Sequence, residues 1–301
     1  MLTLESLRDL ALAHADALRA PVRNLELGGR TLDWSDGPHL MGVVNLSPDS
    51  WYRESVCLDP EAAIARGRRL AVEGATLVDV GAESSVLTAA RADDLQQRHR
   101  LLPVIRGLAA AGILVSAETY SLPVAEACLD AGARALNLTG TTRDADFFRL
   151  AAERDAAVIL CFVEGAHVRA VGDLTLAEDP IPRLRDHFAR RIEDAVRRGV
   201  TRIILDPGLG FYYRNLQDSA TRVRHQMRTF LHTFRLRELG WPLCHALPHA
   251  FEYFQEEVRC AEPFFATLAL LGKTNLLRTH EVARVRAVCR TLGIWQENRS
   301  P

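Results

Sequence analysis

Two short segments decide the fold: HLMGVVNL at residues 39–46 and TLVDVG at residues 76–81. Each is almost continuously apolar, which is the pattern of a β-strand buried on both faces of a sheet. The stretch between them, PEAAIARGRRLAVEG at residues 60–74, is typical of an amphipathic helix. A strand, a helix and a second strand in this order predict a parallel βαβ unit.

The same alternation continues to the end of the chain. Six further apolar runs follow: ILVSAE (113–118), RALNL (134–138), AVILCFV (157–163), RIILDPG (202–208), PLCHAL (242–247) and NLLRTH (275–280). Eight such units over roughly 260 residues predict a (β/α)8 TIM barrel. An open doubly wound sheet is the competing architecture, but it usually carries a glycine-rich loop after its first strand. Here the first strand is followed by SPDSWYRES at residues 47–55.

The residues before the first strand form a separate predicted segment. A helix is expected near residues 3–19, and two short strands are expected around the Gly28-Gly29 turn. We therefore expect residues 1–36 to be an N-terminal extension of one helix and one hairpin. Residues 37–301 are expected to be the α/β barrel domain.

Composition limits the classes of partner and compartment. The 301 residues include 37 Lys+Arg and 38 Asp+Glu, and this formal charge of −1 argues against nucleic acid as an obligate partner. No uncharged apolar stretch is long enough to predict a transmembrane span. The six cysteines are scattered without a CxxC motif, as in a reduced, cytoplasmic protein. Lys273 is the only lysine in the chain, so any lysine-dependent chemistry would have to use it.

Polar residues end most of the predicted strands. In a (β/α)8 barrel, ligands bind at the carboxyl ends of the strands, so these side chains are expected around one mouth. They are Asn45, Asp79, Glu83, Ser84, Glu118, Asn137, Asp206, His245, His249, Arg278 and His280. Carboxylates and amides suit the N–H groups of a nitrogen-rich heterocycle. The same groups could hold a metal ion or a cationic substrate, and the residue types alone leave these alternatives open.

Several of these segments resemble the signatures of the dihydropteroate synthase family. MGVVNLSPDSWYRE (41–54) and GATLVDVGAESS (74–85) are similar to its first two motifs, MGxLNxTPDSFSDGG and GAxIIDVGGESTRPG. The resemblance continues through VSAETY, GARALNLTG, RIILDPGLGF and LLRTHEV in the family's order, and it covers about residues 38–292. It implies a cytoplasmic transferase of folate biosynthesis, usually a homodimer. Enzymes of this family displace diphosphate from a reduced pterin with the amine of p-aminobenzoate, assisted by Mg2+.

The resemblance also implies roles for individual residues. It assigns the pterin contacts to Glu118, Asn137, Asp206 and Phe211. Asn45 would help to hold Mg2+, and Arg278 and His280 would bind the leaving diphosphate. The lid loops would contain Asp49, Ser50, Ser84 and Ser85. The catalytic group would comprise Asp206, Arg278, His280 and His249.

The chain departs from the family pattern at positions that matter for catalysis. The family lysine after the seventh strand is replaced by Ala250, and the second-loop arginine becomes Val86. His249 or His245 could take over the work of the lysine, because histidine serves as both donor and base. A catalytically impaired pterin-binding paralogue is therefore an alternative. A pterin-dependent methyltransferase on the same barrel is another, although the NLSPDS loop argues against it.

Overall fold

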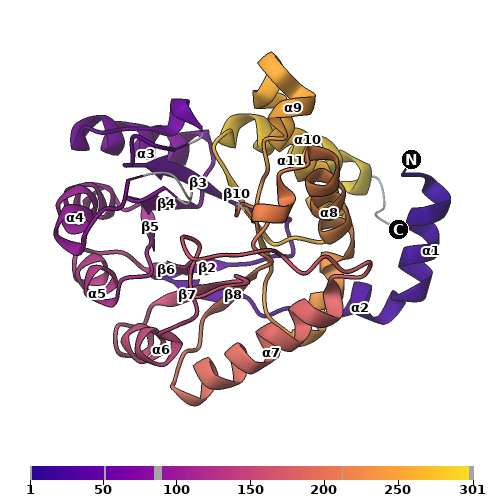
Figure 1. Ribbon diagram of the computed structural model, residues 1–301, viewed down its shortest axis with the longest axis horizontal. Helices are drawn as coiled ribbons and strands as arrows, with labels where there is room; N and C mark the ends of the chain where they lie inside the picture. Colours follow the sequence, from indigo (N-terminus) through magenta and orange to yellow (C-terminus); the bar gives the residue numbers. More distant parts are fainter. Residues whose placement is uncertain (1, 51, 85–89, 212, 298–301) are drawn as a thin grey trace.

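The computed structural model describes residues 2–50, 52–84, 90–211 and 213–297. Its centre is an eight-stranded parallel sheet that curves into a barrel, with helices around the outside (Figure 1). The strand order is β8-β7-β6-β5-β4-β3-β10-β9. A parallel bridge between Leu205 and Leu243 joins the two ends of this order, with the Leu205 N–H donating to the Pro242 carbonyl at 2.9 Å. The predicted (β/α)8 TIM barrel is thus confirmed.

All eight predicted barrel strands are present, each within a few residues of its expected bounds. They are β3 (His39–Asn45), β4 (Leu77–Gly81), β5 (Leu114–Glu118), β6 (Ala135–Leu138), β7 (Ala157–Cys161), β8 (Ile203–Asp206), β9 (Cys244–Ala246) and β10 (Leu276–Thr279). Most of their residues are buried, as expected for strands covered on both faces.

Helices follow the strands along the chain. They are α3 (Pro60–Glu73), α4 (Asp94–Ala110), α5 (Leu122–Asp130), α6 (Asp144–Glu153), α7 (Ile181–Arg197), α8 (Ser219–His232), α9 (Phe251–Phe254), α10 (Ala261–Leu271) and α11 (Val282–Glu297). Short 3-10 helices occupy Arg53–Ser55, Arg214–Leu216, Thr233–Leu239 and Gln255–Cys260. Within the described ranges, no helix combines the length and the apolar character needed to cross a membrane.

The predicted N-terminal hairpin consists of β1 (Leu25–Leu27) and β2 (Arg30–Leu32), paired antiparallel. Its leucines Leu25, Leu27 and Leu32 are almost fully buried in one cluster with Leu77 and Leu276, which begin two barrel strands. The hairpin therefore covers the amino-terminal end of the barrel, opposite the strand ends where the predicted site residues lie.

The expected N-terminal helix is divided into two. α1 (Leu4–Ala13) and α2 (Ala15–Arg19) meet at His14, whose backbone leaves the helical region at φ −132° and ψ 38°. α1 buries no residue completely and lies outside the ring of barrel helices (Figure 1). Within residues 1–36, the hairpin is thus buried against the barrel, whereas α1 is peripheral. The division of the chain into residues 1–36 and 37–301 stays a prediction.

Candidate active site

A buried ion cluster lies at the carboxyl ends of the central strands. The Arg278 side chain, on β10, donates from Nε to Asp79 Oδ2 at 2.7 Å and from Nη2 to Glu118 Oε2 at 2.5 Å. Asp79 is fully buried, and its second oxygen, Oδ1, has no hydrogen-bond partner among the described residues. A buried acceptor without a partner is costly, so Oδ1 marks a place where a ligand N–H group would be stabilised.

Strand register adds an amide and a further carboxylate to this cluster. Glu118 on β5 lies directly opposite Asn137 on β6. Asn137 donates from Nδ2 to Asp79 Oδ2 at 3.0 Å and accepts from Cys161 Sγ at 3.1 Å. Asp206 ends β8, and its Oδ1 accepts the Gly208 N–H at 2.8 Å. The structure thus brings together four of the residues proposed from the sequence, Glu118, Asn137, Asp206 and Arg278, around Asp79.

Burial favours the protonated form of two carboxyl groups in this cluster, those of Glu118 and Asp206. It raises the pKa of Glu118 to about 7, although Arg278 favours the ionised form, and neighbouring Asp79 and Asp206 raise it further. Burial also raises the pKa of Asp206 to about 6, against the Gly208 N–H bond and the charge of Arg278. Both groups therefore change protonation near neutral pH, which is typical of a binding or catalytic site.

These raised pKa values predict how stability depends on pH. The ordinary pKa of a glutamate is 4.5, so between about pH 4.5 and about pH 7 the unfolded chain loses its Glu118 proton while the folded protein retains it. Ionisation thus favours unfolding, and the stabilising contribution of protonated Glu118 is lost as the pH rises through 7. We expect Glu118→Gln to lose less stability than the wild type between about pH 5 and about pH 8, as measured by urea unfolding. Exposed Glu61→Gln should follow the wild type; an unchanged slope in Glu118→Gln would contradict the assignment.

Gly208 gives a second prediction, on the loop that holds Asp206. Its φ is +76°, and a Cβ atom added there would lie 2.1 Å from the Phe162 carbonyl oxygen. Gly208→Ala should therefore lower the free energy of unfolding by about 2 kcal/mol or more. In Gly210→Ala, the nearest contact would be an ordinary 3.4 Å to Ala246 Cβ, so this variant is the matched control in thermal unfolding. Equal melting temperatures for the two variants would disprove the argument.

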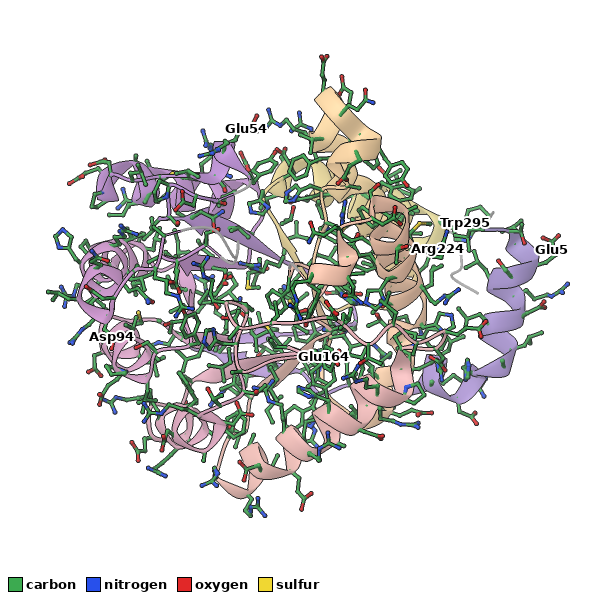
Figure 2. The ribbon with its side chains drawn as sticks, in the orientation of Figure 1. Glu5, Glu54, Asp94, Glu164, Arg224 and Trp295 are labelled. Carbon is green, nitrogen blue, oxygen red and sulfur yellow. The ribbon has the colours of Figure 1, made fainter. Side chains whose placement is uncertain are left out.

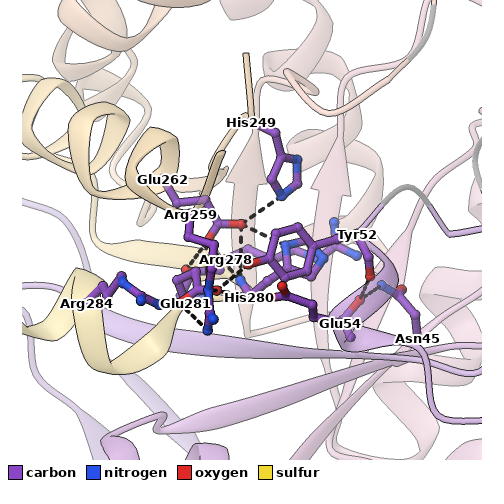
Figure 3. A network of polar contacts seen from close by, with 12 residues as sticks. Asn45, Tyr52, Glu54, His249, Arg259, Glu262, Arg278, His280, Glu281 and Arg284 are labelled. Atoms are coloured by element: carbon purple, nitrogen blue, oxygen red, sulfur yellow. Dashed lines mark hydrogen bonds and ion pairs between the residues drawn. The ribbon is translucent and has the colours of Figure 1, made fainter. Parts of the chain in front are cut away.

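A second polar cluster lies beside the first, around Glu262 at the start of α10 (Figure 3). Glu262 Oε1 lies 2.7 Å from His280 Nδ1 and 3.1 Å from His249 Nε2. Tyr52 stacks on both imidazoles, with ring centroids 4.7 Å from His280 and 4.9 Å from His249. The Tyr52 hydroxyl donates to Glu281, which also accepts from Arg259 Nε at 2.8 Å. The first loop thus covers the two histidines with an aromatic ring.

The expected lid loops contact each other. Ser84 Oγ donates to the Asp49 carbonyl at 3.1 Å, and Asp49 Oδ2 accepts the Ala90 N–H at 3.2 Å. Arg169, from the loop after β7, donates from Nη1 to the Ser84 carbonyl at 2.9 Å. The Ser50 N–H lies 3.4 Å from the Ser47 carbonyl, a turn within the first loop. Ser85 and Val86 lie outside the described residues.

Two other proposed residues lie at the edge of the site. Asn45 ends β3, and its Nδ2 donates to Ser55 Oγ at 2.6 Å. Phe211 follows the Asp206 loop and packs, partly buried, against the barrel core. Within the described ranges, neither residue is hydrogen-bonded to Asp79, so their roles as metal ligand and pterin contact stay predictions.

The structure separates the two histidines that could replace the family lysine. His245 Nε2 lies 2.7 Å from Thr233 Oγ1, and its ring packs at 4.5 Å from that of Phe230, among the outer helices. Burial lowers the pKa of His245 to about 3, so it is neutral there. His249, in contrast, lies beside His280. Lys273 donates to the Leu18 carbonyl of α2 and precedes β10, at the opposite end of the barrel.

A sequence model of pterin-binding enzymes matches residues 41–246, which include most of the barrel strands. The chain belongs to the pterin-binding enzyme family. Dihydropteroate synthase of Mycobacterium leprae is 34% identical over 175 residues, which are 57% of this chain and 62% of that relative. The chain thus spans less than two thirds of that relative's length. The Synechocystis dihydropteroate synthase is 26% identical over 285 residues, covering 90% of this pterin-binding enzyme and 95% of the relative.

Solved structures agree with this family assignment. Xanthomonas albilineans dihydropteroate synthase, in complex with 7,8-dihydropteroate, superposes with a TM-score of 0.73 and 27% identity over 93% of this chain and 100% of that one. The same enzyme with indole-2-carboxylic acid and 6-chloroguanine gives a TM-score of 0.74 and 28% identity, covering 92% and 99%. Full-length structural similarity extends the match beyond residue 246.

Sequence reasoning missed three residues that organise this pterin-binding enzyme. Asp79 was recognised as a polar strand end but given no role, although a carboxylate inside the apolar run TLVDVG was itself a signal. Glu262 begins an apolar helix, and nothing in the local sequence relates it to two histidines elsewhere in the chain. Tyr52 lies in the SPDSWYRES segment, and nothing in that segment indicates contact with two histidines far away in the chain.

Proposed function

We propose that this chain is a dihydropteroate synthase, a transferase of folate biosynthesis that joins a reduced pterin to p-aminobenzoate. The observation that carries the proposal is the buried cluster of Asp79, Glu118, Asn137 and Asp206 around Arg278, with the unpartnered Asp79 Oδ1 within it. The relatives named above, which bear this enzyme's name, support it.

The cluster has the hydrogen-bonding groups that a pterin requires. An aminopyrimidine ring presents N–H donors to carboxylates, while its carbonyl and ring nitrogens accept from an amide or a guanidinium. Asp79 Oδ1 and Asp206 supply acceptors, and Asn137 and Arg278 supply donors. Arg278 compensates the charge of Asp79 and donates to Glu118, whose raised pKa favours its neutral form, so an uncharged ring can bind without burying further unpaired charge.

In the proposed reaction, the amine nitrogen of p-aminobenzoate attacks the methylene carbon that bears the diphosphate. The carbon–oxygen bond breaks as the carbon–nitrogen bond forms, the diphosphate leaves with the electron pair, and the amine loses a proton to solvent. Positive charge near the leaving group stabilises this transition state. Arg278 is the proposed source of charge and His280 a proposed hydrogen-bonding ligand of the diphosphate, and Tyr52 and the contacting loops exclude water.

Mg2+ is part of this proposal, with Asn45 as its ligand. Because the Asn45 amide nitrogen donates to Ser55, its amide oxygen is left to serve as a single neutral ligand. Mg2+ prefers oxygen ligands and is often held by few protein groups together with substrate phosphates, so one amide fits. When bound, the ion would neutralise diphosphate charge.

A homodimer in the cytoplasm completes the proposal. Large apolar side chains are exposed on neighbouring helices α10 and α11, and Trp295 is 77% exposed (Figure 2). The others are Phe264, Leu271, Leu292 and Ile294. Several large exposed apolar side chains on two neighbouring helices favour a subunit interface there.

A condensation assay tests the activity. The purified chain is incubated with 6-hydroxymethyl-7,8-dihydropterin diphosphate, p-aminobenzoate and Mg2+, and 7,8-dihydropteroate is measured by chromatography. Product that increases with enzyme concentration and disappears in Asp206→Asn supports the proposal. Tight pterin binding without product would instead identify a catalytically impaired paralogue. Methyl transfer from methyltetrahydrofolate without condensation would identify the methyltransferase.

A further inference from the structure

Glu262 is a fully buried carboxylate held in a fixed orientation. Its Oε2 accepts from the Thr279 hydroxyl, from the His280 N–H at 2.9 Å and from the Glu281 N–H at 3.1 Å. The donors of these hydrogen bonds all lie at or just after the end of β10, and they bind mainly Oε2. The other oxygen, Oε1, is therefore directed at the two imidazoles (Figure 3).

The imidazole nitrogens and this oxygen converge on one small space. One ligand atom from each of His249, Glu262 and His280 lies within 4.8 Å of the other two. His280 Nδ1 is hydrogen-bonded to Oε1, but His249 Nε2 is buried at 3.1 Å from Oε1 without hydrogen-bond geometry to any partner among the described residues. A buried ring nitrogen in that situation is costly unless something else occupies its lone pair.

We infer that His249, Glu262 and His280 form a binding site for a divalent transition-metal cation of the Zn2+ class. Two imidazoles and one carboxylate, with a fourth position open, are a common ligand set for catalytic zinc. Tetrahedral bonds of about 2.0–2.1 Å separate ligand atoms by about 3.3 Å. The 2.7 and 3.1 Å separations of the nitrogens from Oε1 would widen slightly, and the two nitrogens already lie within 4.8 Å of each other. The imidazoles also favour such a metal over Mg2+, which prefers oxygen ligands.

The surroundings of the three ligands support binding. The Thr279 hydroxyl and two backbone N–H groups orient Glu262, as outer-shell hydrogen bonds do in known metal sites.

The position of the site gives it a role, which rests on the proposed function. His249 is adjacent to Ala250, the position that corresponds to the family lysine, and His280 is a proposed diphosphate ligand. A cation there would supply positive charge at the end of the site where the lysine is missing. Binding itself does not depend on this role and can be measured without any pterin.

The test is metal titration of the untagged, chelator-treated full chain. Zn2+ binding is measured by calorimetry, and Co2+ is titrated as a spectroscopic probe, since tetrahedral Co2+ absorbs intensely in the visible range. The wild type should bind one equivalent with tetrahedral Co2+ absorption. His249→Gln should bind at least about 100-fold more weakly, since loss even of outer-shell partners costs about 10- to 100-fold. His99→Gln, on the exposed face of α4, should match the wild type.

Glu262→Asp is a second variant. It keeps the negative charge, but its carboxylate lies farther from the two imidazoles because the side chain is one methylene group shorter. It should also bind more weakly, and circular dichroism would confirm that each variant is folded. Absence of binding by the wild type, or equal affinity in the wild type and His249→Gln, would overturn the inference. Because these measurements contain no substrate, they distinguish failure of the metal site from failure of the proposed condensation.

Discussion

Replacement of Arg278 by methionine is expected to lower the free energy of unfolding by about 3–5 kcal/mol above neutral pH, because removing one partner leaves buried carboxylates uncompensated. Arg278 contacts Asp79 and Glu118 at 2.7 and 2.5 Å, and Asp79 has no exposed surface. The loss should be smaller at about pH 5, where protonated Glu118 needs no counter-ion. Urea unfolding at two pH values measures both effects.

Two further variants make the Arg278 result interpretable. Arg68→Met, on the exposed face of α3, removes a surface arginine and should change stability by less than about 0.5 kcal/mol. Arg278→Lys keeps the charge but cannot contact two carboxylates with one planar fork, so its stability should be intermediate. A loss below about 1 kcal/mol for Arg278→Met would show that the cluster does not depend on this charge.

Asp206→Asn is expected to reduce affinity for 7,8-dihydropteroate by about 100-fold, because hydrogen bonds to a charged group contribute about 1.5–3 kcal/mol. The substitution preserves the shape of the side chain. It replaces an acceptor by an NH2 donor, which would face the N–H groups of the pterin. Calorimetric titration of the two proteins with 7,8-dihydropteroate measures the difference.

The control for Asp206→Asn is Asp16→Asn, which changes an aspartate that is 96% exposed on α2. It should bind the ligand as the wild type does. Unchanged affinity in Asp206→Asn would remove this carboxylate from the pterin site and leave Asp79 as the principal acceptor.

The fold could be predicted because local sequence determines it almost everywhere. Short, almost continuously apolar runs such as AVILCFV and RIILDPG are typical of strands buried on both faces of a sheet. A helix between successive strands lets them run parallel. The break at His14 was not predictable, because the residues on both sides continue the same helical pattern. The burial of Leu25, Leu27 and Leu32 at the base of the barrel depends on tertiary packing, which the alternation of the hairpin does not specify.

The part of the site that lies at strand ends could be predicted from the sequence, and the part built by helix packing could not. Glu118, Asn137, Asp206 and Arg278 meet because parallel strands place their carboxyl ends around one mouth. The contacts of Glu262 with His249 and His280 arise from the packing of α10 against β10, which joins segments distant in sequence. His245 lies within β9 and packs against Phe230, whereas His249 follows the strand and lies beside His280, so His249 stays the predicted substitute for the lysine.

The proposed function requires that a pterin binds where Asp79, Asn137 and Asp206 meet. A crystal structure of the chain with 7,8-dihydropteroate tests it most directly. We expect the aminopyrimidine edge to lie within hydrogen-bonding distance of Asp79 Oδ1 and the Asp206 carboxylate, with Asn137 donating to the ring. A ligand bound elsewhere, with Asp79 Oδ1 still unpartnered and the Arg278 cluster untouched, would contradict it.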